Sequence, residues 1–306
     1  MLKPIVVVGS INLDLVARAQ HIPRPGETVI GSDFQTFYGG KGANQAVAAA
    51  KLGHPTFMVG NVGDDSFGPQ LRQALEDVGV KTDAVQTVSG SSGVALITIG
   101  TAGENNIVVV PGANALLTPE QVENAAPILR QAGFILAQLE IPLETVLYLA
   151  DFAFRQGIPL MLDPAPARDL PASLLKNANW LTPNESETEI LVKTDVRADD
   201  RTSTSAAAER LLAAGPRHVL LKLGAHGCLI AERDKPQQII PAFSINAVDS
   251  TAAGDAFNAA FAVGLLRGES PSESARFACA VAAISVSRHG AQQSMPTLEE
   301  VEAFLE

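Results

Sequence analysis

The sequence has few cysteines and few positive charges. Its 306 residues include two cysteines, Cys228 and Cys279, whose separation fits neither a zinc-ligand spacing nor a disulfide framework. Lysine and arginine number 22 against 33 acidic residues, which gives a formal net charge of −11. Such an acidic chain is poorly suited to nonspecific binding of nucleic acid or of anionic membranes. An anionic ligand would need local groups to hold it, because the overall field repels it.

Long apolar runs are also missing. No stretch reaches the roughly 18 apolar residues of a membrane span, and the opening MLKPIVVVGSINLD lacks the longer apolar region of a signal peptide. With the sparse cysteines, this predicts a cytoplasmic protein. The five histidines are dispersed without ligand spacing, so we assign none of them to a metal. Hydrophobic residues make up 46% of the chain and charged residues 18%, which indicates a globular protein with a sizeable core.

Short apolar runs recur along the chain and predict buried strands. Alanine-rich or amphipathic segments separate most of them, and this alternation is typical of a parallel sheet with helices on both faces. Thr118 followed by Pro119 predicts a helix start, and Gly53 and Gly215 predict left-handed caps at helix ends. We therefore expect one doubly wound, mostly parallel α/β domain over residues 1–306, with strands at IVVV (5–8), FMVG (57–60), FILAQL (134–139), IPLML (158–162) and VLLKL (219–223).

Two segments break this alternation. Residues 14–38 and 86–112 are rich in β-formers and turns and lack a helical period. In the second, VALITI and IVVV flank the turn-prone TAGENN, which predicts a hairpin. We interpret both segments as strands outside the main sheet that form a lid over a site and exclude water from it. The alternative is an extra edge sheet that serves only packing.

The segment GGKGANQAVAAAKLG, residues 39–53, is a glycine-rich loop that leads into a helix. Its glycines allow the backbone to approach another group closely, and the helix start offers unpaired N–H groups. It is not a Walker A loop, because Gly42 follows Lys41 where Ser or Thr is required, and it lacks the third glycine of a dinucleotide fingerprint. A tight turn before a packed helix and a ligand loop both remain open, and the polar Lys41 and Asn44 favour the ligand loop.

The segment DSTAAGDAFNAAF, residues 249–261, places small residues ahead of an apolar helix. If that helix begins near Ala252, the N–H groups of Ala252, Ala253 and Gly254 point out of its end and form an anion hole. Asp255, in the first turn, would then be placed to accept a proton from an attacking hydroxyl. For an isolated helix start, the simpler interpretation is an aspartate that only complements the helix dipole.

Together these two segments resemble the signature segments of the ribokinase-type carbohydrate kinase family. The resemblance covers essentially the whole chain, and it implies ATP-dependent phosphorylation of a sugar hydroxyl, specifically the 5-hydroxyl of D-ribose, with Mg²⁺. Further matching pieces occur in the expected order: GSINLD (9–14), HIPRPGET (21–28), GDDSFG (63–68), QLEIPLE (138–144), LDPAPAR (162–168), TPNESETE (182–189), KLGAHG (222–227) and SRHGAQQSMP (287–296).

The resemblance also implies roles for individual residues. Asp255 would be the catalytic base, and Ala252, Ala253 and Gly254 would form the anion hole. Sugar-binding positions would lie at the end of the first strand and in the glycine-rich loop, with one further carboxylate: Asn12, Asp14, Gly40, Lys41, Gly42, Asn44 and Glu140, together with Asp255. The positions implied for ATP are Asn184, Lys222, Leu223, Gly224, Ala225, His226, Gly227, Gly254 and Cys279.

The same resemblance implies two metal sites and a homodimer. Glu187 would hold Mg²⁺ through bound water, although on periodicity alone it is an ordinary charge on a helix face. K⁺ would bind beside the anion hole, partly through backbone carbonyls, at Asp249, Thr251, Ser285, Arg288, Gly290 and Ser294. The lid would pair two subunits into a homodimer, and the small-molecule partners would be ribose and ATP.

Some positions depart from the family pattern. Ser250, Ala256 and Ala259 replace residues that are more common there, but all are small and leave Gly254 and Asp255 intact. The position of Cys279 varies in the family, which leaves the nucleotide preference open. Three alternatives remain: a related kinase acting on fructose, a keto-deoxy acid or a nucleoside; a non-catalytic sugar sensor; and a nucleotide-dependent dehydrogenase, which the glycine spacing disfavours.

Overall fold

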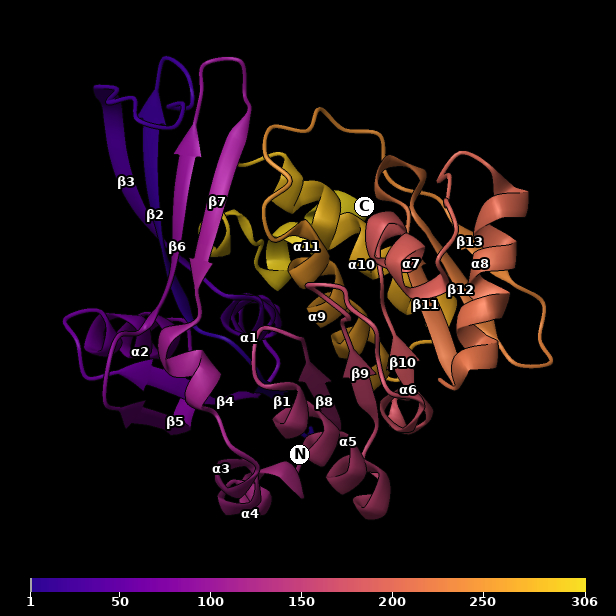
Figure 1. Ribbon diagram of the computed structural model, residues 1–306. Coiled ribbons are helices and arrows are strands. Elements are labelled where there is room, and N and C mark those ends of the chain that lie inside the picture. Colours follow the sequence, from indigo (N-terminus) through magenta and orange to yellow (C-terminus); the bar gives the residue numbers. More distant parts are fainter. Residues whose placement is uncertain (1) are drawn as a thin grey trace.

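A nine-stranded sheet forms the centre of the molecule in a computed structural model, which describes residues 2–306. All neighbouring strands pair in parallel except β11 with β12 and β12 with β13, which are antiparallel. Figure 1 shows this sheet running across the molecule. Its order is β13 (Gln238–Ile240), β12 (Cys228–Glu232), β11 (His218–Lys222), β10 (Trp180–Leu181), β9 (Leu160–Leu162), β8 (Phe134–Ala137), β1 (Ile5–Val8), β4 (Thr56–Gly63) and β5 (Lys81–Val88).

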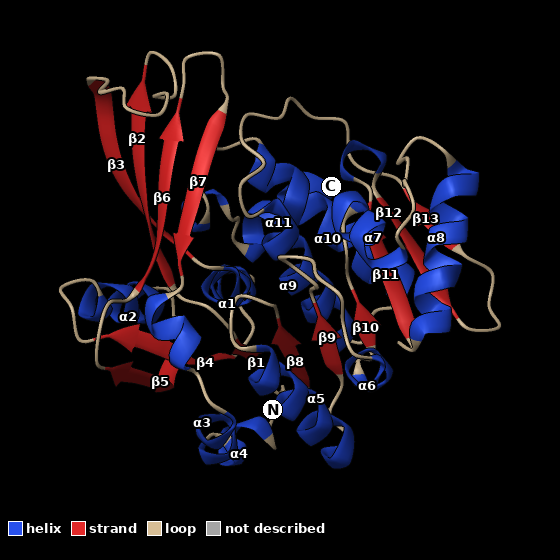
Figure 2. Ribbon diagram, in the orientation of Figure 1, coloured by secondary structure: helices blue, strands red, loops and turns tan. Residues whose placement is uncertain are grey.

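Helices cover both faces of this sheet (Figure 2). Successive side chains of a strand point to opposite faces: Ile5 and Val7 of β1 belong to one apolar cluster, and Val6 and Val8 to the other. The first cluster contains side chains of α1 (Lys41–Lys51), α2 (Gly68–Asp77), α9 (Ala253–Leu266), α10 (Pro271–Val286) and α11 (Leu298–Leu305). The second contains side chains of α3 (Pro119–Asn124), α4 (Ala126–Leu129), α5 (Leu143–Gln156), α6 (Ala172–Asn177), α7 (Glu185–Val192) and α8 (Arg201–Ala214).

A second sheet of four strands, here called the small sheet, stands apart from the large one in Figure 1. The expected hairpin is present, because β6 pairs antiparallel with β7. The sequence boundaries were partly wrong: residues 86–88 belong to β5 of the large sheet, and the small sheet already starts at Asn12. Its order is β3 (Gly31–Gly39), β2 (Asn12–Ala19), β6 (Gly93–Ile99) and β7 (Asn105–Val110).

Most of the local sequence predictions are confirmed. Each of the five expected strands is found, and Thr118 caps α3 with Pro119 in its first turn. Gly53 follows α1 with a φ of 75°. Gly215 does end α8, but its φ of 143° is not that of a left-handed cap. Glycine is needed there because a Cβ would lie 2.9 Å from the backbone nitrogen of Lys176.

Parallel register brings the carboxyl ends of the central strands together. Val8 of β1 pairs with Ala137 of β8, and Ala137 pairs with Leu162 of β9. The residues that follow these strands therefore meet at one edge of the sheet, where open α/β sheets place their ligands. Short 3₁₀ helices complete the connections: η1 (Gly112–Leu116), η2 (Gly224–His226) and η3 (Gln292–Ser294). No helix within residues 2–306 is long and apolar enough to cross a membrane.

The glycine run before α1 lets this helix reach that edge. Gly40 has a φ of 86°, and a Cβ on it would lie 2.7 Å from the backbone nitrogen of Asn12. A Cβ on Gly42 would lie 2.7 Å from the backbone nitrogen of Ser10. Only glycine permits this approach, so the loop and the β1–β2 connection are fixed against each other.

We expect Gly40→Ala to lower the free energy of unfolding by about 3 kcal/mol, because it combines a left-handed φ with a backbone clash. Gly53→Ala is the matched control: its φ is 75° but nothing lies within 4 Å of the added Cβ, so it should cost only about 1 kcal/mol. Urea unfolding of both variants measures the difference. Equal losses would show that the Gly40 contact is not required.

Candidate active site

The start of α9 lies at the centre of the site. Ala252 adopts a left-handed conformation with φ 59° and ends the preceding turn, and α9 begins at Ala253. The expectation of three outward amides was partly wrong, because the N–H of Ala253 donates to the carbonyl of Ser250 at 3.2 Å. Within residues 2–306, the N–H groups of Ala252 and Gly254 have no acceptor. These two amides are therefore available to an anion.

Asp255, in the first turn of α9, is buried with 5% of its surface exposed. Its carboxylate accepts hydrogen bonds from two side chains of α1: Asn44 Nδ2 donates to Oδ2 at 3.0 Å, and Gln45 Nε2 donates to Oδ1 at 3.1 Å. Burial raises the pKa of Asp255 to about 6, and the neighbouring Asp163 adds to this rise against the lowering effect of Lys41 and the two amides. Such a carboxyl is a suitable general base near neutral pH.

Lys222, the last residue of β11, lies beside the start of α9. A Cβ on Gly254 would lie 3.4 Å from Lys222 Nζ. The same Nζ donates to Oδ1 of Asp163 at 3.2 Å. A fixed ammonium and two helix-start amides thus converge from neighbouring elements, which is an arrangement suited to phosphate oxygens.

The expected sugar-binding residues are linked to Asp255 by charge: Lys41 interacts with both Asp255 and Glu140, and Glu140 interacts with Asp14. Asn12 and Asp14 belong to β2 of the small sheet and not to the end of the first strand as expected, because β1 already ends at Val8. Asn12 Oδ1 accepts from Asn114 Nδ2 at 2.7 Å. Burial raises the pKa of Asp14 to about 6, with a further contribution from Glu140. The site thus offers several oxygen acceptors to hydroxyl groups.

Glu140 and Lys41 join the glycine loop to the large sheet. Oε2 of Glu140 accepts hydrogen bonds from Ser10 Oγ at 2.5 Å and from the backbone N–H of Lys41 at 3.1 Å. Burial lowers the pKa of Lys41, but carboxylates around it, of which Asp255 and Asp163 act most strongly, outweigh burial and leave it above the ordinary range. Lys41 therefore stays cationic at the junction of the site.

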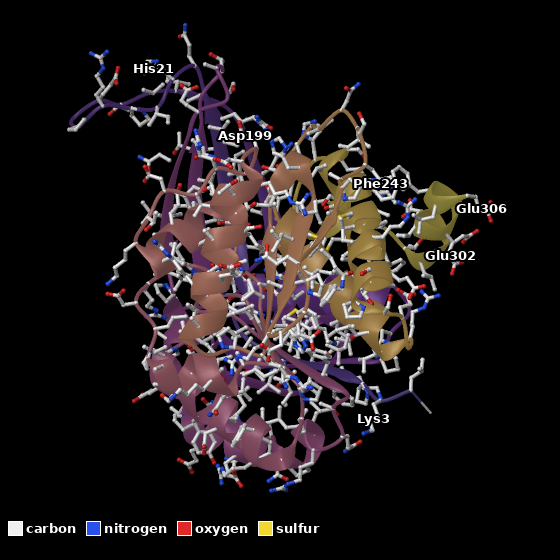
Figure 3. The ribbon with its side chains drawn as sticks, turned by 90° about the vertical axis from the view of Figure 1, so that its right-hand side faces the viewer. Lys3, His21, Asp199, Phe243, Glu302 and Glu306 are labelled. Atoms are coloured by element: carbon white, nitrogen blue, oxygen red, sulfur yellow. The ribbon has the colours of Figure 1, made fainter. Side chains whose placement is uncertain are left out.

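A cavity of about 310 Å³ opens beside the start of α9 and is lined in part by Ala253 and Gly254. Six of the residues expected to contact ATP line it, whereas Asn184, Leu223 and His226 do not. The remaining lining is largely apolar and includes Phe243, labelled in Figure 3, whose ring packs edge-on against Phe304 of α11. An apolar cavity that ends beside free helix-start amides and the Lys222 ammonium fits a nucleotide, whose base is apolar on its faces and whose phosphates are anionic. The six expected residues are Lys222, Gly224, Ala225, Gly227, Gly254 and Cys279.

Asn184 and Glu187 have a structural role that the sequence reasoning did not assign. They form a capping box at the start of α7, in which Asn184 Oδ1 accepts from the Glu187 N–H and Glu187 Oε2 accepts from the Asn184 N–H, both at 2.8 Å. Burial raises the pKa of Glu187, and Asp163 opposes Lys222 in this effect. No protein donor within residues 2–306 reaches Glu187 Oε1, so this oxygen fits a hydrated Mg²⁺.

The six positions expected for K⁺ fall into two bonded groups and one ion pair. Asp249 Oδ1 accepts from the N–H and Oγ1 of Thr251, and its Oδ2 accepts from the N–H of Gly290 at 2.9 Å. Ser285 and Ser294 share a hydrogen bond of 2.8 Å. The guanidinium of Arg288 pairs with Glu300, 2.7 Å away, so only its backbone carbonyl is suited to a cation. Asp249 ties these loops together just ahead of α9.

Comparisons with known proteins agree with this geometry. The pfkB family carbohydrate kinase model matches residues 2–298. Ribokinase of Bacillus subtilis is 43% identical, over 99% of this chain and 100% of its own, and deoxyribokinase of Salmonella typhi is 39% identical, over 98% of each. A structure of Arabidopsis thaliana ribokinase complexed with ribose and ATP superposes with a TM-score of 0.92 at 35% identity, over 100% of this chain and 99% of that one.

The chain belongs to the pfkB family of carbohydrate kinases. The fold and the site define an ATP-dependent kinase, and Mg²⁺ accompanies the ATP. The doubly wound, mostly parallel fold expected from the sequence is confirmed.

Three residues of the site were missed from the sequence: Gln45, Gln138 and Asp163, all buried. Gln45 lies inside the glycine-rich segment, next to Asn44. Gln138 and Asp163 each follow a buried strand within a segment that matches the family. A polar residue directly after an apolar parallel strand is the signal that could have identified them.

We expect Cys279→Phe to raise the KM for ATP about tenfold or more, because the larger ring fills the cavity that Cys279 lines. Cys228→Ala is the control, since Cys228 is a buried cysteine outside the lining. Steady-state kinetics and thermal midpoints of both variants are compared. An unchanged KM in a folded Cys279→Phe protein would remove the nucleotide from this cavity.

Proposed function

We propose that this kinase transfers the γ-phosphoryl group of ATP to the 5-hydroxyl of D-ribose. The observation that carries this proposal is the position of α9: Ala253 and Gly254 line the apolar cavity, and the next residue, Asp255, accepts from Asn44 of the glycine-rich helix. One helix turn thus borders both substrates. The relatives named ribokinase and the ribose-bound Arabidopsis structure support ribose as the sugar substrate.

The residues of the site divide the reaction between them. Asp255 accepts the proton of the attacking hydroxyl, and the buried Asn44 amide holds the carboxylate toward the sugar side. The amides of Ala252 and Gly254 and the ammonium of Lys222 stabilise charge on the transferring phosphoryl group. Mg²⁺, held near Glu187 through water, would neutralise phosphate charge when bound. Positioning and electrostatics supply most of the catalysis in such a site.

The specific alternative is 2-deoxyribose, since the Salmonella typhi relative is named deoxyribokinase at 39% identity. A coupled assay of ADP release with ribose, 2-deoxyribose, fructose and a nucleoside separates these candidates. We expect ribose to give the highest kcat/KM, because the site presents more buried acceptors than a deoxy sugar can satisfy. Highest activity on another sugar would overturn the assignment, and no sugar-dependent ADP release would favour a sensor.

We also propose that K⁺ activates the enzyme by ordering the loop ahead of α9. Asp249 supports this, because burial raises its pKa but hydrogen bonds from Thr251 and Gly290 leave it below the ordinary range, so it stays anionic. The same ADP assay without K⁺ tests the idea. Activity that is equal in Na⁺ and K⁺ would contradict it.

The small sheet is proposed to act as the lid and as the homodimer contact of a cytoplasmic enzyme. It contributes Asn12 and Asp14 to the site, and Val108 and Val110 of β7 lie exposed on one of its faces, where Leu96 of β6 pairs opposite Val108 and Val108 is 54% exposed. Its far end, marked by His21 in Figure 3, stands away from the rest of the molecule. Such an apolar face on a protruding sheet fits a second copy. Sedimentation as a monomer at micromolar concentration would rule out the dimer.

Asp255→Asn should lower kcat on the order of 10²-fold or more while ribose still binds, since the amide cannot accept the proton. In the unchanged enzyme kcat should fall as the pH drops through about 6, where Asp255 becomes protonated. Calorimetric ribose titration and kcat between pH 5 and 8 measure both effects. A near-normal kcat in Asp255→Asn would exclude Asp255 as the base.

A further inference from the structure

One side-chain amide lies between the two most buried carboxylates of the site. Gln45 Nε2 donates to Asp255 Oδ1 at 3.1 Å and to Asp163 Oδ2 at 3.2 Å. Gln45 is 1% exposed and Asp163 2% exposed, so water does not replace these bonds. Two carboxylates that share one donor repel each other in a buried site, and the charge of Asp163 accordingly raises the pKa of Asp255. An amide that donates to both offsets part of this repulsion.

Gln138 fixes which end of the Gln45 amide faces the carboxylates. Its Nε2 donates to Gln45 Oε1 at 2.7 Å, and it is itself fully buried. The Gln138 side chain is confined in turn, because a Cβ on Gly9 would lie 2.1 Å from Gln138 Oε1. If Gln45 rotated, its oxygen would face two carboxylates and its NH₂ would face a donor. The order of donors along this chain is therefore fixed by chemistry.

The far end of the chain reaches the nucleotide side. Asp163 uses its second oxygen, Oδ1, to accept from Lys222 Nζ at 3.2 Å. The series Gln138, Gln45, Asp163 and Lys222 thus connects the carboxyl ends of β8, β9 and β11 with α1. Asp255 is attached to it through the shared Gln45 amide. Within residues 2–306, the buried Oε1 of Gln138 has no partner, but every link between these four residues is made. A connected set of buried hydrogen bonds holds its members in one arrangement.

We propose that Gln45 is a positioning residue that connects the base Asp255 to Asp163 and thereby to Lys222. It keeps the proton acceptor and the phosphate-binding ammonium at fixed positions relative to each other. The inference rests on the proposed function. It assigns to Gln45, Gln138 and Asp163 a role in the reaction without contact with either substrate.

Loss of the Gln45 donor and loss of the Asp163 charge should change the pKa of Asp255 in opposite directions. Lys41 faces it from α1 and Asp163 from the end of β9, while Lys222 and Glu187 act around Asp163. Loss of the Gln45 donor removes a hydrogen bond to the ionised form and should raise the pKa of Asp255. Loss of the Asp163 charge removes a repulsion and should lower that pKa. A purely structural role would not separate the two directions.

The test measures kcat as a function of pH and compares the acid limb of this profile in the unchanged enzyme, in Gln45→Met and in Asp163→Asn. Both replacements are close in shape to the original side chains. For Gln45→Met we expect the limb to move to higher pH by about half a unit or more, with a kcat loss of about tenfold. For Asp163→Asn we expect a move to lower pH. Limbs that stay in place, or that move in the same direction, would overturn the proposal.

Gln121→Met is the matched control. Gln121 of α3 also bridges two acceptors through Nε2, at 3.0 Å to Asn61 Oδ1 and 2.8 Å to Gln86 Oε1, but it lies outside the site. It should lose stability and keep the wild-type limb, and a shifted limb in this control would also overturn the proposal.

Gln138→Met provides a second route if Gln45→Met does not fold. Releasing the Gln45 amide should move the limb in the same upward direction by a smaller amount, and an unmoved limb would refute the role of Gln45. The proposed function fails separately, when the unchanged enzyme shows no ribose-dependent ADP release. Thermal midpoints of all variants confirm that the compared proteins are folded.

Discussion

The structure depends on keeping the carboxylate of Asp255 ionisable inside the protein. Burying a charge costs several kcal/mol unless hydrogen bonds and opposite charge compensate for it. Here the compensation comes from α1, through Asn44, Gln45 and the charge of Lys41. α1 must therefore pack directly against α9. That packing in turn requires the glycine loop ahead of α1 to approach the β1–β2 connection as closely as Gly40 does.

Parallel strand ends supply the rest of the site. Because β1, β8 and β9 are in register, the polar residues that follow them lie at one edge, and Gln138 and Asp163 both bond to Gln45 although 25 positions separate them in the sequence. The flanking helices bury the strands on both faces. A rigid sheet therefore fixes the polar edge, and the small sheet adds Asn12 and Asp14 from a separate element.

Much of this could be predicted from the sequence, since continuous apolar runs and glycine-rich turns are local signals. The strands at 5–8 and 219–223 and the start of α9 depend on such signals. Asn12 and Asp14 were assigned to the wrong strand because only three residues separate β1 from β2. The partners of Asp163 depend on register between distant strands, and the Ala253 amide depends on one turn closing on Ser250. Neither leaves a local pattern.

The two sides of Asp255 differ in charge in the way its two substrates differ. A sugar brings hydroxyl donors, and Asp14 and Glu140, neither of which lines the nucleotide cavity, offer carboxylate acceptors for them. ATP brings only phosphate acceptors at its reacting end, and the side toward the cavity offers free amides and Lys222. An acidic chain can hold a polyanion only if its own carboxylates are screened from it. The Asp163–Lys222 pair and the Gln45 bridge provide that screening at the boundary, so the base and the anion site can lie within a single helical turn.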